Sequence, residues 1–459
     1  MTDNSAKPIL FVSMPEAGLF NPMYVLAKEL TRRGVPDVWF ATDEPRRADI
    51  EAISASFASL GEVIPELSAL TWDDETHRAV TGPSRFRSHR DQIKAGYRPA
   101  LWFAKYRQLE AVVDKVCPAV MVIDCETRYA IDLAIARRIP YVLSVPFLVS
   151  NVLTPYTPFA RSYVPRRFPT PHTGLPYDMN LLQAISNRLF RLRTLAMFFT
   201  PSVGKTMQED IAIRKELGLP KPPEPMTRVA EAQLVLCYSV AEMDYPLEIP
   251  DHVRLVGPMI PPLPQAPAGE LAEWLDARPS VIYVGLGTNT RLTSAEVSSL
   301  TEVARRLEGT HHVLWKLPKE QQHLLPPRES LPGNLRIESW VPSQLDVLAH
   351  PNVAAFVTHG GGNGFHEGLY FGKPMVVRPL WGDCYDVAVR GKDMGVSLTL
   401  DPRRTVDPAH VVSLLTRVLT EPSFRRRAGE FAALERAAGG QEEAADLVLS
   451  VSALRAPTT

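Results

Sequence analysis

The most informative segment of the chain, residues 340–386, reads WVPSQLDVLAHPNVAAFVTHGGGNGFHEGLYFGKPMVVRPLWGDCYD. At its centre lies VAAFVT (353–358), a continuous apolar run of the kind that forms a strand buried on both faces. A glycine-rich loop, HGGGNG, follows this run, and a helical pattern continues through Glu367. A buried strand, a glycine-rich loop and a helix in this order predict one unit of a parallel α/β sheet.

Short apolar runs alternate with helical patterns on both sides of this segment. The runs in the second half of the chain are 281–287, 312–317, 335–340, 353–358, 373–380 and 396–400, and those in the first half are 8–14, 37–42, 119–124, 140–147 and 233–239. Strands that alternate with helices form parallel sheets covered on both faces. The predicted fold class is therefore α/β, with two doubly wound Rossmann-like domains.

Proline-rich sequence marks the expected boundary between the two domains. The stretch that includes PPLPQAP predicts a linker over residues 241–268. We expect an N-terminal domain over 1–240, a second domain over 269–425 and C-terminal helices over 426–459.

Single residues mark the ends of some helices. Asn21 is a suitable helix cap and Pro22 suits a first helical position, so together they predict the start of a helix that stops at Gly34. Gly439 and Gly440 predict a break in the C-terminal helical region.

Composition narrows the class of protein. Of the 459 residues 45% are hydrophobic and 22% charged, and the formal net charge is -1. This balance argues against nucleic acid or an anionic membrane as the main partner. The polar N-terminus and the lack of an apolar run of about 18 residues predict a cytoplasmic protein. The scattered cysteines (Cys117, Cys125, Cys237 and Cys384) have no metal-ligand spacing, so we expect no metal site.

The region 151–199 differs from the rest of the first half. Residues 151–178 are rich in Pro, Tyr and Phe, and residues 181–199 form an amphipathic pattern with Arg188, Arg191 and Arg193. We favour a helix packed over a ligand-binding cleft, and the alternative is a helix in peripheral contact with a membrane surface. Nothing in the pattern specifies an oligomeric state.

Side chains around the glycine-rich loop suit a phosphorylated ligand. Backbone N–H groups of the loop and the positive end of the following helix can hold a diphosphate, and His359 can donate to a phosphate oxygen. Glu367, one turn into the helix, can reach a ribose diol, and Trp340 can stack on a base. A glycine-rich loop alone is weak evidence, but this combination in one strand–loop–helix context is specific.

The segment resembles the donor-binding signature of the family 1 glycosyltransferases, which include plant and animal UDP-sugar transferases and macrolide-modifying bacterial enzymes. The resemblance extends over most of the chain, through GLFNP near the N-terminus, VGPM before the linker and GLGTNT at 285–290. It implies a GT-B architecture, with two Rossmann-like domains facing across a cleft. It also implies an inverting, metal-independent transferase that uses a nucleotide-diphosphate sugar as co-substrate and no other cofactor.

The family's donor-binding roles fall on matching positions of this sequence. The resemblance implies that Trp340 stacks on the base, that Gln344 lies near the base or ribose, and that Glu367 holds the ribose. Asp383 would contact the donor sugar. The residues implied to hold the diphosphate are Thr288, His359, Gly361, Gly362, Asn363 and Gly364.

The N-terminal loop departs from the family pattern. The loop reads PEAGLFNP, and Leu19 stands where the family has the His that takes the proton from the acceptor hydroxyl. Asp124 matches the Asp that normally orients this His, and it is the first candidate for a replacement base. Glu16 and His172 are the second and third candidates. Leu19 and its neighbour Phe20 are expected to contact the acceptor.

Two further departures concern the donor. Cys384 stands where many UDP-glucose users have a Gln that holds sugar hydroxyls, and a thiol is a poor hydrogen-bond partner. The extra Ser343 in WVPSQ shifts Gln344 relative to Trp340, which opens the base pocket to guanine as well as uracil. Together, Leu19, the stretch VPDVWFATDE (35–44), Cys384 and the 151–178 segment are similar to bacterial polyene macrolide glycosyltransferases, which transfer mycosamine from a GDP-linked donor in antibiotic biosynthesis.

Two other hypotheses remain open, and a third fits the sequence poorly. The first is a UDP-glucose-dependent enzyme acting on small phenols or macrolides. The second is a catalytically silent glycosyltransferase-like partner protein, because Leu19 removes the usual base. A nicotinamide-dependent dehydrogenase is a poor fit, because the N-terminal loop is not GxGxxG.

Overall fold

The structure, a computed structural model, describes residues 8–221, 225–266, 269–451 and 454. The chain forms two compact units, which do not follow one another simply along the sequence. Unit 1 comprises Met1–Pro171, Met179–Met259 and Ala438–Thr459, and unit 2 comprises His172–Asp178 and Ile260–Ala437. Each unit has its own parallel sheet, so the predicted α/β class is confirmed.

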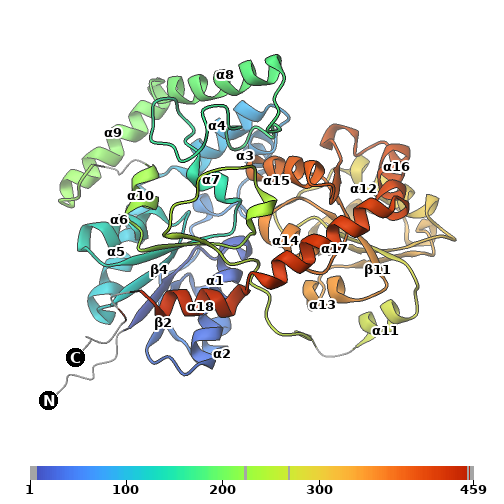
Figure 1. Ribbon diagram of the computed structural model, residues 1–459, viewed down its shortest axis with the longest axis horizontal. Helices are drawn as coiled ribbons and strands as arrows, with labels where there is room; N and C mark the ends of the chain where they lie inside the picture. Colours follow the sequence, from blue (N-terminus) through green and yellow to red (C-terminus); the bar gives the residue numbers. More distant parts are fainter. Residues whose placement is uncertain (1–7, 222–224, 267–268, 452–453, 455–459) are drawn as a thin grey trace. The chain divides into compact units, whose positions relative to one another are not determined.

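Unit 1 contains a seven-stranded parallel sheet in the order β3-β2-β1-β4-β5-β6-β7. This is the Rossmann order, in which chain direction across the sheet reverses between the first and fourth strands. Strands β2 and β4 of this sheet are labelled in Figure 1. The strands are β1 (Ile9–Val12), β2 (Val38–Thr42), β3 (Ser56–Ser59), β4 (Val120–Asp124), β5 (Tyr141–Val145), β6 (Leu234–Cys237) and β7 (Val253–Leu255). The helices are α1 (Ala17–Arg32), α2 (Arg47–Ala52), α3 (Asp74–Val80), α4 (Arg85–Gly96), α5 (Pro99–Val116), α6 (Arg128–Arg137), α7 (Val149–Leu153), α8 (Leu181–Met197), α9 (Pro201–Glu216), α10 (Pro225–Glu231) and α18 (Gly440–Leu449).

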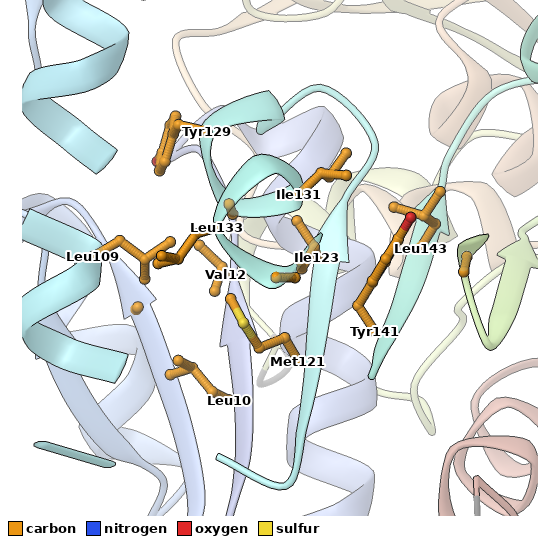
Figure 2. Close-up of a cluster of buried hydrophobic side chains, with 14 of the residues drawn as sticks. Leu10, Val12, Leu109, Met121, Ile123, Tyr129, Ile131, Leu133, Tyr141 and Leu143 are labelled. Carbon is orange, nitrogen blue, oxygen red and sulfur yellow. The ribbon is translucent and has the colours of Figure 1, made fainter. Parts of the chain in front are cut away.

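The central strands of unit 1 are buried on both faces, as their continuous apolar sequences predict. On one face, alternate residues of β1 and β4 pack against α5 and α6 (Figure 2). Leu10 and Met121 lie there beside Leu109 of α5 and Leu133 of α6. The other face packs against α1 and α18, which lie side by side. This core fixes the carboxyl ends of β1 and β4 next to each other.

Two boundaries in unit 1 differ from the sequence predictions. Helix α1 begins at Ala17 with Glu16 as its N-cap residue, so Pro22 lies inside the helix and not at its first position. The stop at Gly34 is confirmed, with a φ of 75°. The expected linker over 241–268 is wrong in part, because β7 extends the sheet of unit 1 beside β6.

Unit 2 contains a six-stranded parallel sheet in the order β10-β9-β8-β11-β12-β13, again the Rossmann order. The strands are β8 (Val281–Gly285), β9 (His312–Lys316), β10 (Leu335–Glu338), β11 (Val353–Thr358), β12 (Met375–Val377) and β13 (Ser397–Thr399). The helices are α11 (Glu270–Asp276), α12 (Ser294–Arg306), α13 (Gln344–Ala349), α14 (Gly362–Tyr370), α15 (Gly382–Asp393), α16 (Pro408–Thr420) and α17 (Pro422–Ala437).

Unit 2 also holds a short segment from the first half of the chain, His172–Asp178. The buried carboxylate of Asp386 in α15 accepts the backbone N–H groups of His172 (2.6 Å) and Gly174 (3.0 Å). Near the C-terminus, positive φ angles at Gly439 and Gly440 end the helical path, as predicted, and the chain continues as α18 of unit 1. The boundaries expected at 240 and 425 therefore differ from those of the compact units.

Candidate functional site

The centre of the site in unit 2 is the imidazole of His359, which lies at the carboxyl ends of β8 and β11. The strand order reverses between β8 and β11, and open α/β sheets bind ligands at such a point. A Cβ atom on Gly287 would lie 2.6 Å from the His359 Cε1 atom, and a Cβ on Gly361 would overlap Nε2. The two loops need glycine at these positions because the histidine ring occupies the space between them.

His359 is held in its neutral form. Burial lowers the pKa of His359 to about 4, and the cationic side chains of Lys316 and Arg378 contribute in the same direction. Its Nδ1 atom is buried without a hydrogen-bond partner. A neutral imidazole has one N–H donor, so the ring can donate to an anion without carrying a charge itself.

The N-terminus of α14 forms the anion-binding part of the site. Gly361 is the N-cap residue, so no side chain caps the helix, and Gly362, Asn363 and Gly364 form the first turn. The unpaired N–H groups of a first turn and the helix dipole favour a negative charge. At Gly360, whose φ is 80°, a Cβ atom would lie 2.8 Å from Val377 Cγ1. Close packing thus holds the loop in one conformation.

Glu367 is joined to Gln344 and Tyr283 by a chain of hydrogen bonds. The Gln344 Nε2 atom donates to Glu367 Oε2 (2.6 Å), and the Tyr283 hydroxyl donates to Gln344 Oε1 (3.0 Å). Burial raises the pKa of Glu367, while Gln344 and Lys316 act to lower it. Ser343 caps α13 by accepting the Asp346 N–H (3.1 Å). The extra serine therefore starts the helix whose first residue, Gln344, orients Glu367.

Trp340 and Lys316 lie beside this chain. The indole of Trp340 is 63% exposed, so one face can stack on a ligand, and the Lys316 Nζ atom lies 5.1 Å from its ring centroid. Burial lowers the pKa of Lys316, and the charge of Glu367 opposes this shift. Sequence reasoning missed Lys316. Its position as the last residue of β9, next to β8 in the sheet, is the signal that could have found it.

The remaining donor candidates surround this centre. Thr288 is exposed in the loop after β8, directly after Gly287. Asp383 lies in the first turn of α15. Cys384 is buried, with its Cβ atom against the Gly360 position, and burial raises the pKa of its thiol well above the usual value. The structure thus brings the predicted donor residues together in unit 2.

Unit 1 has a second polar cluster at the corresponding point of its own sheet, between β1 and β4. Asp124 is fully buried, and its two carboxylate oxygens accept four hydrogen bonds. Oδ2 accepts the Met14 N–H (2.8 Å) and the Thr127 hydroxyl, and Oδ1 accepts the N–H groups of Glu126 (2.9 Å) and Thr127 (2.8 Å). Asp124 therefore anchors the loop after β1, and burial raises its pKa to about 6 against the effect of these hydrogen bonds.

Glu16, in the loop that Asp124 anchors, has a different environment. Both carboxyl oxygens are buried without a hydrogen bond of normal geometry. Burial raises the pKa of Glu16, and the charges of Asp124 and Asp43 add to this, against the effect of the Ser68 hydroxyl. The carboxyl lines a small cavity of about 20 Å³, enough for one water molecule, beside the Lys105–Asp43 ion pair (2.6 Å).

The other predicted residues of the acceptor half have different surroundings. Phe20 is 1% exposed and packs against Phe40, with a centroid distance of 5.3 Å, so its expected contact with an acceptor is wrong. Leu19 is partly exposed. His172 belongs to unit 2, where burial lowers its pKa to about 4.

The pH dependence of stability tests this burial of His172. The folded pKa lies below the ordinary value of about 6.5, so the unfolded chain gains a proton first, and stability is lost as the pH falls from about 6.5 toward 4. His172→Asn suits the φ of 70° and does not titrate. We expect the loss of unfolding free energy between pH 8 and pH 5 to shrink by about 2 kcal/mol in urea titrations.

The control variant is His323→Asn, at an exposed site, which should leave this loss unchanged. Equal losses in wild type and His172→Asn would contradict the burial.

Two Rossmann-order sheets, with a glycine-rich loop and a helix N-terminus at the switch point of the second, define a protein of the GT-B class. Solved structures share this fold. The glycotransferase of kitacinnamycin matches with a TM-score of 0.71 and 21% identity over 97% of this chain and 98% of that chain. The spinosyn forosaminyltransferase SpnP matches with a TM-score of 0.61 and 19% identity over 97% and 98%.

The family model described as UDP-glucoronosyl and UDP-glucosyl transferase matches residues 103–437, and the chain belongs to this family. UDP-glucuronosyltransferase 2C1 of Oryctolagus cuniculus is 29% identical over 304 residues, which are 63% of this chain and 55% of the relative. UDP-glucosyltransferase 2 of Dactylopius coccus is 27% identical over 324 residues, 68% of this chain and 58% of the relative. The chain thus spans just over half the length of these relatives.

Two kinds of feature are absent from the described residues. Within those ranges, no group of three or more His, Cys, Asp or Glu side chains has an arrangement that could hold a metal ion. None of the helices there combines the length and the hydropathy that crossing a bilayer requires.

Proposed function

We propose that the protein is an inverting glycosyltransferase that moves a sugar from a nucleoside diphosphate to a hydroxyl group of a hydrophobic natural product. The observation that carries this proposal is the cluster at the switch point of unit 2. There the α14 N-terminus, neutral His359 and Lys316 surround one position with hydrogen-bond donors and positive charge. Donors fixed in this way stabilise a diphosphate as it leaves. Family membership supports the same function.

Glu16 is the proposed general base, in place of the missing histidine. A carboxylate whose pKa is raised by burial is a stronger base than an ordinary carboxylate. Asp124 keeps the loop of Glu16 in place through the Met14 N–H. The roles of Asp124 and His172 as bases stay predictions, and the variants described in the Discussion separate them from Glu16.

A cavity of about 600 Å³ in unit 1 is the proposed site for the apolar body of the acceptor. Its volume lies in the range of ligand pockets, and Ile93, Tyr97 and Leu101 line it together with charged side chains. Glu66 also lines this cavity, while its neighbour Leu67 lines the small cavity of Glu16. One short segment of chain thus separates the proposed acceptor body from the proposed base.

The proposed donor is a GDP-linked deoxyamino hexose such as mycosamine, and the proposed acceptor is a polyene macrolide aglycone. The buried Cys384 thiol offers no group for the hydroxyls of a fully oxygenated sugar, whereas Asp383 can pair with an ammonium group. The alternative donor is UDP-glucose, and the similarity to a UDP-glucosyltransferase supports it. The alternative from another class is a silent glycosyltransferase-like partner.

Thermal unfolding in the presence of nucleotides separates these proposals. A ligand that binds only the folded state raises its stability by RT ln(1 + [L]/Kd). We expect GDP to raise the melting temperature more than UDP does, and Trp340→Ala to remove most of the shift through loss of base stacking, worth about 1–3 kcal/mol. Because Trp340 is exposed, the melting temperature without nucleotide should not change. A larger shift with UDP would favour the glucosyltransferase, and no shift with either would favour the silent partner.

A further inference from the structure

Helix α8 of unit 1 has an unusual distribution of side chains. Its outward face is apolar: Leu181, Leu182, Ile185, Leu189 and Leu192 have exposed fractions between 43% and 77%. Leu181 and Leu182 are adjacent and the others follow at steps of three or four residues, so all five lie on one side of the helix. Phe199, just beyond the C-terminus of α8, is 81% exposed. Figure 1 shows α8 near α4 and α9 at the periphery of unit 1.

The inward face of α8 is more polar than the outward face, and hydrogen bonds fix its orientation. The Asn187 side chain accepts the Thr170 N–H (2.9 Å) and donates to the Phe168 carbonyl oxygen (3.0 Å). Arg191 donates to the Thr170 hydroxyl (2.6 Å). Rotation that buried the leucines would break these buried bonds, which is costly. These hydrogen bonds therefore keep the apolar face of α8 pointing outward.

The charges on and near α8 indicate which kind of partner suits its apolar face. Helix α8 has no acidic residue, and the exposed cations Arg188 and Arg193 lie at the two borders of the apolar stripe. Exposed arginines also occur close by in sequence, at positions 161, 166 and 167 of the segment that leads to Phe168. An apolar stripe bordered by arginines is suited to a lipid surface, where the aliphatic side chains enter the acyl boundary and the guanidinium groups meet phosphates.

We propose that α8 is an interfacial helix that seats unit 1 on an anionic lipid bilayer. The arginine borders favour anionic headgroups over zwitterionic ones. Exposed leucines that met a second copy of the chain would instead bring the border arginines of two helices together, which repel. The proposal does not depend on the proposed transferase function, because its test measures binding to lipid and not turnover.

The test is sedimentation of the purified chain with vesicles of phosphatidylcholine alone or mixed with phosphatidylglycerol. We expect the chain to sediment with the anionic vesicles and to remain in solution with phosphatidylcholine. Leu192→Glu, which places a carboxylate in the stripe, should weaken binding by about tenfold or more. Arg188→Gln should weaken binding about fivefold, and added salt should reduce the difference.

The control variant is Ile211→Glu in α9. Ile211 is 51% exposed and Leu192 is 50% exposed, so the two substitutions add the same charge at helical sites of equal exposure. Ile211 lies between exposed polar residues, Gln208 and Lys215, and should tolerate the change without loss of vesicle binding. An unchanged circular dichroism spectrum and melting temperature of Leu192→Glu would show that the chain remains folded. Equal binding by Leu192→Glu and wild type would overturn the proposal. So would a failure of wild type to bind anionic vesicles, or a wild-type dimer that Leu192→Glu dissociates.

Discussion

Replacement of Glu16 by glutamine is expected to lower kcat by about a hundredfold to ten-thousandfold, the range for loss of a general base. The amide keeps the size of the side chain but cannot take a proton from the acceptor hydroxyl. In wild type, kcat/KM should fall on the acid side as Glu16 becomes protonated, at a pH above the ordinary carboxyl range because burial raises its pKa. This acid limb should disappear in Glu16→Gln. The assay uses a polyene macrolactone as acceptor. The donor is a sugar linked to whichever nucleoside diphosphate stabilises the chain in thermal unfolding.

Measurements of stability distinguish a carboxylate that acts as a general base from one that has a structural role. Because the folded pKa of Glu16 is raised, ionisation above that pKa costs stability, and Glu16→Gln removes this cost. The variant should therefore melt at the same temperature as wild type or higher at pH 8. Asp124→Asn should lose stability at the same pH, because its amide would direct an N–H group at donors that now bind a carboxylate.

The controls also decide between the three candidate bases. Glu51→Gln, an exposed carboxylate of α2, should change neither kcat nor stability. His172→Asn should keep kcat within a few-fold of wild type. A Glu16→Gln variant with wild-type kcat would remove Glu16 from the mechanism, and a large loss of kcat in His172→Asn would place the base in unit 2.

The donor cluster could be predicted in large part because it is nearly contiguous in sequence. Trp340, His359 and Glu367 lie on one strand–loop–helix series, and the glycines between them mark where the backbone approaches a ligand. Lys316 could not be found in this way, because it reaches the cluster only through the pairing of β9 with β8. The contact of Gln344 with Glu367 likewise depends on where α13 begins.

The acceptor half was harder to predict, because the role of each residue there depends on how its side chain is buried and not only on its residue type. Asp124 ends a strand, as expected, but the sequence does not reveal that backbone N–H groups occupy its carboxylate. Phe20 follows Leu19 in the loop sequence, yet α1 begins early enough to turn its ring into the core. The short strand β7 lies within proline-rich sequence that is typical of a linker, and only its pairing with β6 reveals it.

His359→Leu is expected to lower kcat by about a hundredfold to a thousandfold, as removal of a donor to a developing charge does. The leaving diphosphate gains charge in the transition state, so the donor acts mainly there, and KM should change less than kcat. A pKa of about 4 keeps wild-type His359 neutral from pH 6 to pH 8. Titration of His359 should therefore not affect kcat over this range. We expect the kcat values of wild type and His359→Leu to depend on pH in the same way from pH 6 to pH 8.

Gly361→Ala tests whether the position of the His359 ring matters as much as its ability to donate a hydrogen bond. The backbone at Gly361 is extended, so alanine adds no strain there, but its Cβ atom would displace the imidazole. We expect a fall in kcat close to that of His359→Leu, since a donor moved by about 1 Å loses most of its effect on a transition state. Gly429→Ala in α17, where a Cβ atom meets nothing within 4 Å, is the matched control and should retain full activity. If Gly361→Ala also retained full activity, His359 would not be the donor, because its ring cannot occupy the same place beside an added methyl group.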